Sequence, residues 1–102
     1  MLAPYVCLKC RSTFKRPGDQ DEKTCPKCGS KCYRFDVRFK PPPKRDDAQW
    51  KKIEYLLGRG IRFQKMYRSE GHGLLRVTYP KDMREAKDFA DKYASGEYIA
   101  FD

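Results

Sequence analysis

Histidine and long apolar runs are both scarce in this chain of 102 residues. The one histidine, His72, lies between two glycines in an expected turn and has no obvious catalytic or metal-binding partners. No apolar run approaches the roughly 20 residues that a membrane-spanning helix needs. The first five residues form neither a basic leader nor an apolar signal segment, so we expect a cytoplasmic protein with reduced thiols.

Sequence motifs for catalysis are also missing. Gly58-Arg59-Gly60 is too short for a phosphate-binding loop and follows an expected helix, and no nucleophile elbow is present. The carboxylates between Asp82 and Asp91 have the pattern of a helix cap and a solvated helix face. We therefore predict that the protein is not an enzyme.

Acidic residues are rare in the first 45 positions. This part holds 12 of the 23 Lys and Arg residues but only 4 of the 14 Asp and Glu residues, a formal charge of +8, whereas positions 46–102 carry +1. Four thiolates and one zinc ion would lower the first value by two, to about +6. A charge excess confined to one small module favours a polyanionic partner, and nucleic acid is the commonest one.

Two Cys-x-x-Cys pairs are the most specific motif in the chain. Cys7 with Cys10 and Cys25 with Cys28 are separated by residues 11 to 24. Two residues between thiols allow one tight turn to aim both sulfurs at one ion, and two such knuckles complete a tetrahedron. Because all four positions are taken by protein, we predict one structural Zn²⁺ ion with no place for substrate.

A fifth cysteine, Cys32, extends the second pair to a C-x2-C-x3-C run. It could replace a neighbour as a ligand, but the turn chemistry of Pro26 and Gly29 favours Cys25 and Cys28. Cys32 is then either a small packed hydrophobic residue or an exposed, oxidisable thiol.

Residues 3–40 carry a family resemblance. The run Tyr5-Val6-Cys7-Leu8-Lys9-Cys10 with Phe14, followed by Cys25-Pro26-Lys27-Cys28-Gly29-Ser30, resembles the zinc ribbon, and most closely the short N-terminal ribbons of the FmdB type, a regulatory group. The chain departs from this pattern at Arg11, where such ribbons usually have glycine. The resemblance implies a rubredoxin-like knuckle fold with structural zinc. It leaves function open, since zinc ribbons serve in transcription, the ribosome, recombination and protein docking.

Aromatic residues alternate with charged ones after the second knuckle. Tyr33, Phe35, Val37 and Phe39 share one face of an expected strand that reaches Lys40. This face either packs in the core or stacks on nucleic-acid bases.

Three prolines at 41–43 divide the chain. We expect a zinc ribbon at 1–40, a basic proline-rich linker at 41–45, and a small α/β unit at 46–102. The unit is expected to contain helices at 46–58 and 82–95, strands at 61–67 and 74–79, and a short last strand at 98–101. The fold class predicted is small α+β, an N-terminal antiparallel β zinc ribbon followed by a two-layer α-β-β-α unit.

The basic residues of the ribbon and linker form the predicted interface. They are Lys9, Arg11, Lys15, Arg16, Lys27, Lys31, Arg34, Arg38, Lys40, Lys44 and Arg45. Such side chains neutralise phosphates without reading sequence, so we expect DNA or RNA binding with low sequence specificity and a role as a transcription regulator or accessory factor. Neither a membrane nor a small-molecule substrate is expected. One alternative is a protein-interaction adaptor that docks through the ribbon or the α/β half, and a weaker one is redox or metal transfer through Cys32.

Overall fold

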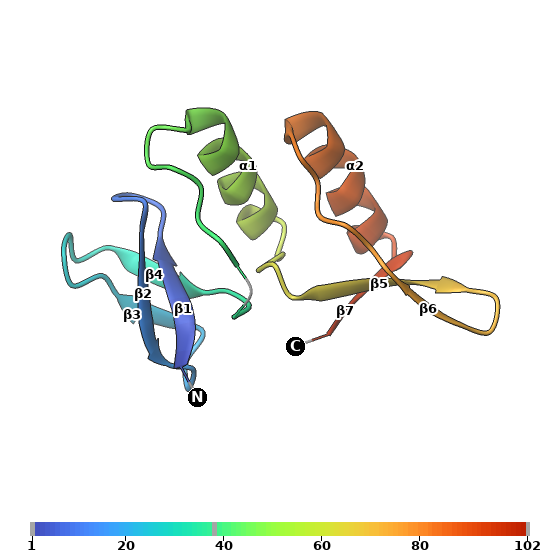
Figure 1. Cartoon of the computed structure of the whole chain (residues 1–102), viewed down its shortest axis with the longest axis horizontal. Coiled ribbons are helices and arrows are strands. Elements are labelled where there is room, and N and C mark those ends of the chain that lie inside the picture. Colours follow the sequence, from blue (N-terminus) through green and yellow to red (C-terminus); the bar gives the residue numbers. More distant parts are fainter. Residues whose placement is uncertain (1, 38, 102) are drawn as a thin grey trace.

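The computed structural model describes residues 2–37 and 39–101. In these ranges the chain forms two helices and two antiparallel sheets (Figure 1), which confirms the predicted small α+β class. The N-terminal sheet has the spatial order β2-β1-β4-β3 and consists of β1 (Leu2–Cys7), β2 (Ser12–Pro17), β3 (Glu22–Thr24) and β4 (Lys31–Arg34). The remaining elements are α1 (Asp47–Gly58), β5 (Lys65–Glu70), β6 (Gly73–Arg76), α2 (Met83–Ala94) and β7 (Tyr98–Phe101).

Strand β1 is buried because it lies inside the N-terminal sheet and both of its faces are covered. Tyr5 packs on one face with Ala3 and Cys7, and its hydroxyl donates to the carbonyl oxygens of Pro17 and Gln20 at 3.1 and 2.6 Å. These two bonds fix the connection between β2 and β3, which consists of turn-forming residues.

The strand expected from Tyr33 to Lys40 is shorter than its sequence pattern indicates, since β4 ends at Arg34. Beyond it the Phe39 N–H donates to the Asp36 carbonyl oxygen at 3.0 Å, so the chain turns. The turn brings the Phe35 and Phe39 rings into an edge-on contact with centroids 4.8 Å apart. Burial of both rings is therefore achieved by folding back and not by a continuous extended strand.

The proline run at 41–43 lies outside helices and strands, but it is fixed at its end. The Trp50 indole N–H donates to the Pro43 carbonyl oxygen at 2.9 Å, and the Arg11 guanidinium donates to the Lys44 carbonyl oxygen at 2.6 Å. The linker is thus bonded to α1 on one side and to the first knuckle on the other.

Helix α1 begins where the sequence indicates a cap. Asp46 is the N-cap residue, and its carboxylate accepts a bond from the Gln49 N–H at 3.3 Å. The apolar stripe that follows buries Trp50, Ile53 and Leu56. Since this stripe faces two clusters, α1 packs against the N-terminal sheet and α2 together.

Strand β5 starts later than the expected Ile61. Gly60 has a φ of 82° and Phe63 has a φ of 61°, both in the left-handed region that interrupts an extended strand. The Ile61 N–H instead bonds to the Leu56 carbonyl oxygen at 2.9 Å, and its side chain is fully buried. The strand therefore covers Lys65–Glu70 and not residues 61–67.

The second half closes with β6, α2 and β7. Strand β6 covers Gly73–Arg76 in place of 74–79, although the Val77 N–H still bonds to the Met66 carbonyl oxygen at 2.9 Å. Helix α2 starts after Asp82, whose carboxylate accepts from the Glu85 N–H at 2.9 Å. Strand β7 pairs with the free edge of β5, so the C-terminal sheet has the order β6-β5-β7.

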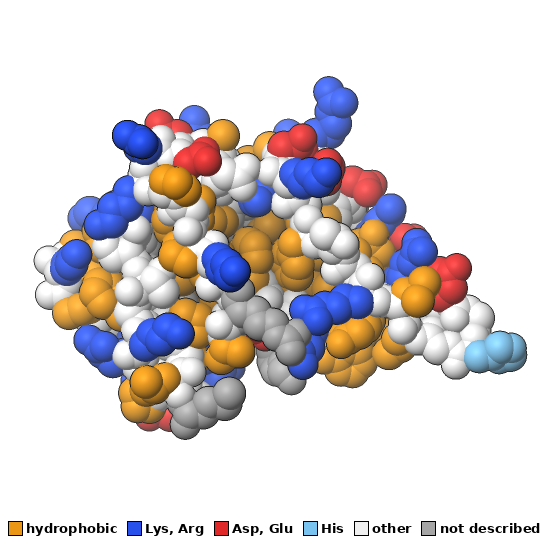
Figure 2. Space-filling view, in the orientation of Figure 1, with side chains coloured by type: hydrophobic (Ala, Val, Ile, Leu, Met, Phe, Trp, Pro, Cys, Tyr) orange, Lys and Arg blue, Asp and Glu red, His pale blue; other side chains and the backbone are white. Residues whose placement is uncertain are grey.

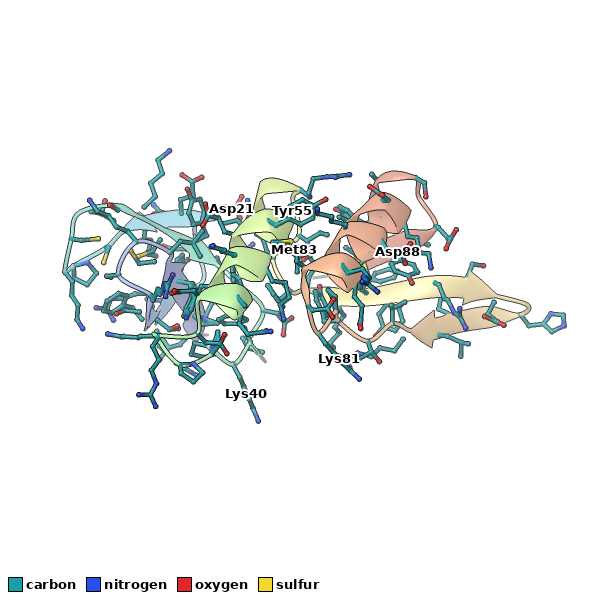
Figure 3. The ribbon with its side chains drawn as sticks, turned by 90° about the horizontal axis from the view of Figure 1, so that it is seen from above. Asp21, Lys40, Tyr55, Lys81, Met83 and Asp88 are labelled. Carbon is teal, nitrogen blue, oxygen red and sulfur yellow. The ribbon has the colours of Figure 1, made fainter. Side chains whose placement is uncertain are left out.

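The two helices lie side by side, with α2 next to the C-terminal sheet and α1 between α2 and the N-terminal sheet (Figure 1). Tyr55 of α1 and Met83 of α2 lie between them (Figure 3), and both pack on a core cluster around Leu56, Ile61 and Met66. In the described part of the chain, neither helix has the length and apolar character needed to cross a bilayer.

Candidate metal centre and basic surface

The first knuckle is the turn between β1 and β2. Cys7 is fully buried at the end of β1, and Cys10 is partly buried. Arg11, the residue after Cys10, has a φ of 54°. The position that holds glycine in the resembling ribbons is thus left-handed here as well, and an arginine occupies it at a conformational cost.

The second knuckle joins β3 to β4 by a turn of the same kind. The Gly29 N–H donates to the Cys25 carbonyl oxygen at 3.0 Å, and the Cys25 N–H donates to the Ser30 carbonyl oxygen at 2.7 Å. Gly29 follows Cys28 as Arg11 follows Cys10, and its φ is 74°. The residue after the last cysteine is therefore left-handed in both turns, although one is arginine and the other glycine.

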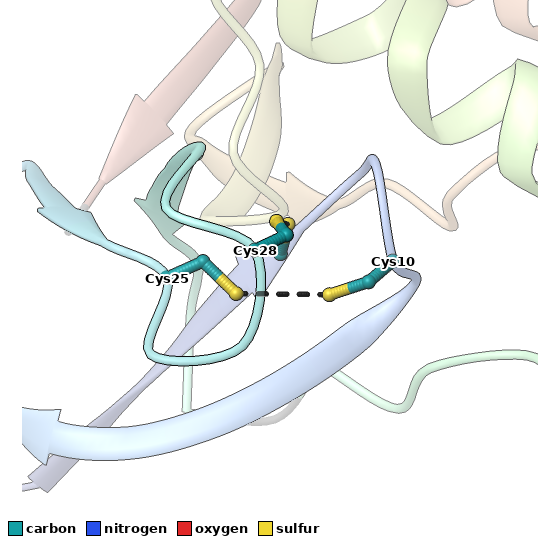
Figure 4. A group of neighbouring side chains, drawn as sticks. Cys10, Cys25 and Cys28 are labelled. Atoms are coloured by element: carbon teal, nitrogen blue, oxygen red, sulfur yellow. Dashed lines mark hydrogen bonds between the residues drawn. The ribbon is translucent and has the colours of Figure 1, made fainter.

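The four cysteine sulfurs converge between the knuckles, all within 4.8 Å of one another. Cys7 Sγ lies 3.5 Å from Cys28 Sγ, and Cys10 Sγ lies 3.6 Å from Cys25 Sγ, the contact drawn in Figure 4. A tetrahedral site with zinc–sulfur bonds of about 2.3 Å has sulfur–sulfur edges of about 3.8 Å. The cluster therefore has the size that one thiolate-bound metal ion requires.

Backbone groups around the sulfurs favour negative charge at part of this site. Burial raises the pKa of Cys7 to about 12. Burial also opposes ionisation of Cys25, but hydrogen bonds from the N–H groups of Cys28 and Lys27, together with those of the Cys10 and Cys28 thiols, bring the pKa of Cys25 to about 6. The N–H and hydroxyl groups of Ser30 lower the pKa of Cys28. These donors are the partners that a set of metal-bound thiolates needs.

The fifth cysteine lies beside the cluster. Cys32 is 1% exposed and packs with Tyr5, Cys7 and Cys25. Burial raises the pKa of its thiol to about 11. Of the two interpretations of this residue as a non-ligand, packed hydrophobic or exposed oxidisable thiol, the structure supports the packed one.

Fold and site together define a small α+β protein with a four-cysteine cluster that can hold a metal ion, as in a zinc ribbon. Comparisons with protein families, with curated proteins and with solved structures find no match to this chain. The assignment of a possible metal site therefore depends only on the positions of the four cysteines in this structure.

Two of the predicted interface cations are held in contacts within the protein. Arg11 forms an ion pair with Asp47 at 2.5 Å. Arg34 donates to the Gly18 carbonyl oxygen and to the Asp21 carboxylate, each at 3.0 Å. Both guanidinium groups fix loops, so their availability for phosphates is smaller than the sequence pattern indicates.

Other predicted cations are exposed. Lys9 and Lys27 occupy the two knuckles, and Lys15 and Arg16 lie on the edge strand β2. Lys31 is exposed but pairs with Glu22 at 3.4 Å. Lys40 and the linker residues Lys44 and Arg45 are exposed, while Arg38 lies outside the described residues. Figure 2 shows Lys and Arg side chains spread over the end of the molecule formed by the N-terminal sheet. Figure 3 shows the Lys40 side chain pointing away from the protein.

The aromatic residues after the second knuckle belong to the core. Phe35 is 3% exposed and packs with Val6, Trp50 and Ile53, while Tyr33 and Phe39 are partly buried against the same cluster. Of the two alternatives for this face, core packing is the one that the structure shows. The cluster joins the N-terminal sheet to α1.

A buried lysine escaped the sequence reasoning. Lys52 of α1 is 8% exposed, and its ammonium donates to the Gln49 side-chain oxygen at 2.6 Å and to the Pro80 carbonyl oxygen at 3.1 Å. Lys52 belongs to no sequence motif, and its partner Pro80 is 28 residues away in the chain. Its burial between α1 and the segment before α2 could therefore not be predicted from the neighbouring residues. His72, in contrast, is exposed at the β5–β6 turn, as Figure 2 shows at the far end of the molecule.

Proposed function

We propose that this chain is a non-enzymatic zinc-ribbon protein that binds nucleic acid through the exposed cations of its N-terminal sheet and linker. The main observation in its favour is that the first 45 residues keep an excess of exposed cations after their acidic residues have formed ion pairs. The four thiolates would hold Zn²⁺ as a closed structural site, which stabilises the knuckles and offers no open coordination position. A reducing compartment, the cytoplasm, fits five free cysteines.

Ion pairing consumes acidic groups and leaves several cations. Three of the four acidic residues in the first 45 positions pair with neighbouring cations. These pairs are Asp19–Lys23 at 3.0 Å, Asp21–Arg34 at 3.0 Å and Glu22–Lys31 at 3.4 Å. Within the described part of this region, the exposed cations without an ion-pair partner are Lys9, Lys15, Arg16, Lys27, Lys40, Lys44 and Arg45. We call this set the basic surface.

The basic surface is suited to phosphates. Lys9 and Lys27 are exposed in two turns whose cysteines meet at one site, so both lysines lie at the same end of the sheet. Exposed ammonium groups release counterions when they contact phosphates, which gives affinity without sequence preference. This chemistry fits a regulator or an accessory factor of a nucleic-acid machine, in keeping with the resemblance to FmdB-type ribbons.

The test is a salt titration of the zinc-loaded protein with labelled single- and double-stranded DNA and RNA, followed by fluorescence anisotropy. We expect affinity to fall steeply with salt. The Lys9→Gln, Lys27→Gln double variant should bind all sequences more weakly and lower the salt slope by about 2.

The matched control removes the same charge elsewhere. Arg84 and Lys87 are exposed on α2, so Arg84→Gln with Lys87→Gln should leave binding nearly unchanged. Absence of binding by the unaltered protein at low salt would refute the proposal, as would equal losses in the two double variants.

Protein docking is the second candidate, favoured by one surface cavity. A cavity of about 600 Å³ lies between the start of β1 and the start of β5. Leu2 and Val37 line it and are 56% and 47% exposed. A protein partner that covers these side chains would remove apolar surface from water. Retention of a partner by wild-type protein and its loss with Leu2→Ser would favour this candidate.

A further inference from the structure

The C-terminal sheet has one face without a covering element in the described chain. Met66 and Ala100 point toward the helices, where they join the cluster around Leu56. Side chains alternate along a strand, so the neighbouring residues point the other way. We call this side the outer face; it carries Lys65, Tyr67, Leu74, Arg76, Ile99 and Phe101.

Aromatic and apolar side chains on the outer face are accessible. Phe101 is 43% exposed, and Ile99 and Leu74 are 40% and 47% exposed. The Tyr67 and Phe101 rings meet edge-on, with centroids 5.3 Å apart and planes at 75°. This contact orders both rings before any ligand arrives, which lowers the conformational entropy that binding must overcome.

Cross-strand pairing places cations beside these rings. Tyr67 pairs with Arg76 on β6 and with Ile99 on β7, and Lys65 pairs with Phe101. Each aromatic side chain therefore has a cationic neighbour in its own row of the sheet.

The outer face carries positive charge only, as far as the described strand residues show. Glu70 alternates to the opposite side of β5 from Tyr67 and forms an ion pair with Arg68 at 3.1 Å. A second copy of the chain laid on this face would bring Lys65 and Arg76 against like charges, which opposes self-association. Rings flanked by cations fit a ligand that offers both flat bases and phosphates.

We propose that the outer face binds single-stranded nucleic acid, with bases stacked on Phe101 and Tyr67 and phosphates contacted by Lys65 and Arg76. Stacking on exposed sheet aromatics tolerates any base, since every base has a π-face. A base within a duplex is already stacked and cannot use these rings. The inference rests on the proposed nucleic-acid function and adds a second contact surface that prefers single strands.

The experiment compares Phe101→Leu with Phe101→Tyr in the full zinc-loaded chain, using a labelled single strand of about 16 nucleotides and its duplex. Leucine keeps an apolar side chain but removes the π-face, whereas tyrosine keeps it. We expect Phe101→Leu to weaken single-strand binding about tenfold with an unchanged salt slope, and Phe101→Tyr to bind as the wild type does. Duplex binding should not change in either variant.

Further measurements separate this inference from the proposed function. Photo-cross-linking of a halogenated-uracil strand should place the cross-link on the peptides that contain Tyr67 or Phe101, as located by mass spectrometry. Equal single-strand affinity for Phe101→Leu and wild type, combined with the loss expected for Lys9→Gln, Lys27→Gln, would overturn the stacking inference and leave the basic surface standing. If the wild type binds no nucleic acid at all, both the proposed function and the stacking inference are wrong. If Phe101→Leu instead changes the oligomeric state in sedimentation, a second copy occupies the face and the inference is wrong.

Discussion

The Arg11 guanidinium lies 2.5 Å from the carboxylate of Asp47, which follows it by 36 residues and opens helix α1. The same guanidinium lies over the Trp50 ring, 6.0 Å from its centroid, and lowers the pKa of Asp47 through its hydrogen bond and charge. One residue of the first knuckle thus contacts the linker and the first helix. Its backbone meanwhile keeps a conformation that glycine adopts more readily.

Substitution of Arg11 should separate these two effects. Arg11→Gly and Arg11→Ala both remove the guanidinium, but only glycine relieves the left-handed backbone, so we expect the glycine variant to be more stable than the alanine variant by about 1 kcal/mol. Chemical denaturation of the zinc-loaded proteins measures the difference. Asp47→Asn serves as the control for the ion pair, and because the Asp47 carboxylate is exposed, this variant should change stability little. Equal stability of the two Arg11 variants would contradict the backbone argument.

Metal content should depend on four cysteines and not on the fifth. We expect one zinc ion per chain in the wild type, and loss of metal with a large loss of thermal stability in Cys7→Ser and Cys28→Ser, because three thiolates leave the site open. Cys32→Ala should keep its zinc. Elemental analysis and thermal melting test both statements, and loss of zinc from Cys32→Ala would mean that the ligand set is different.

Lys52 should make the folded protein more stable as the pH rises in the alkaline range below 10.5. Burial lowers the pKa of Lys52 below 10.5, although the carboxylates of Asp46, Asp82 and Glu85 oppose the shift. Between the lowered pKa and 10.5 the unfolded chain holds more protons than the folded one, so stability rises with pH in that window. As the pH is raised toward 10.5, melting temperatures should rise more in the wild type than in Lys52→Met.

This comparison contains its own control. Burial also raises the pKa of Tyr79, which acts in the opposite direction at higher pH, but both proteins share that residue. The difference between their curves therefore reports Lys52 alone. Parallel curves would show that the folded protein does not disfavour the charged ammonium group.

The cluster that joins the two halves should control the stability of both. Phe35 is 3% exposed and its ring lies 4.8 Å from Phe39 and 5.4 Å from Phe63, so Phe35→Ala should cost about 3–5 kcal/mol. Phe101→Ala, at an exposed position, should cost far less. Circular dichroism of the helices and Trp50 fluorescence should report one shared transition. Two separate transitions would show that the halves unfold independently.

Local chemistry explains which parts of the structure could be predicted from the sequence. The Cys7–Cys10 and Cys25–Cys28 spacings are short-range features, and the caps at Asp46 and Asp82 act within one helical turn. The strand ends were harder to predict because tertiary contacts decide them. Phe63 interrupts the expected strand with a left-handed backbone while its ring stacks on Tyr79, 4.8 Å away.

Tertiary contacts also explain why the sequence alone could not show which predicted interface residues are free to bind phosphate. Arg11 and Arg34 look like free cations in the sequence, because Asp47 and Asp21, their partners, are distant along the chain. The outer-face aromatics were missed for a related reason. Tyr67 and Phe101 come from separate strands, and only the pairing of β5 with β7 brings them together.

The shared cluster also sets an order of events during synthesis. All four cysteines of the cluster are made before residue 29, so the two knuckles can come together early. Phe35 can then cover part of Val6, but Trp50 and Ile53, which complete the cluster, emerge later. A growing chain that stalls between these points would present a partly exposed N-terminal sheet, and the arrival of α1 completes the cover of that sheet.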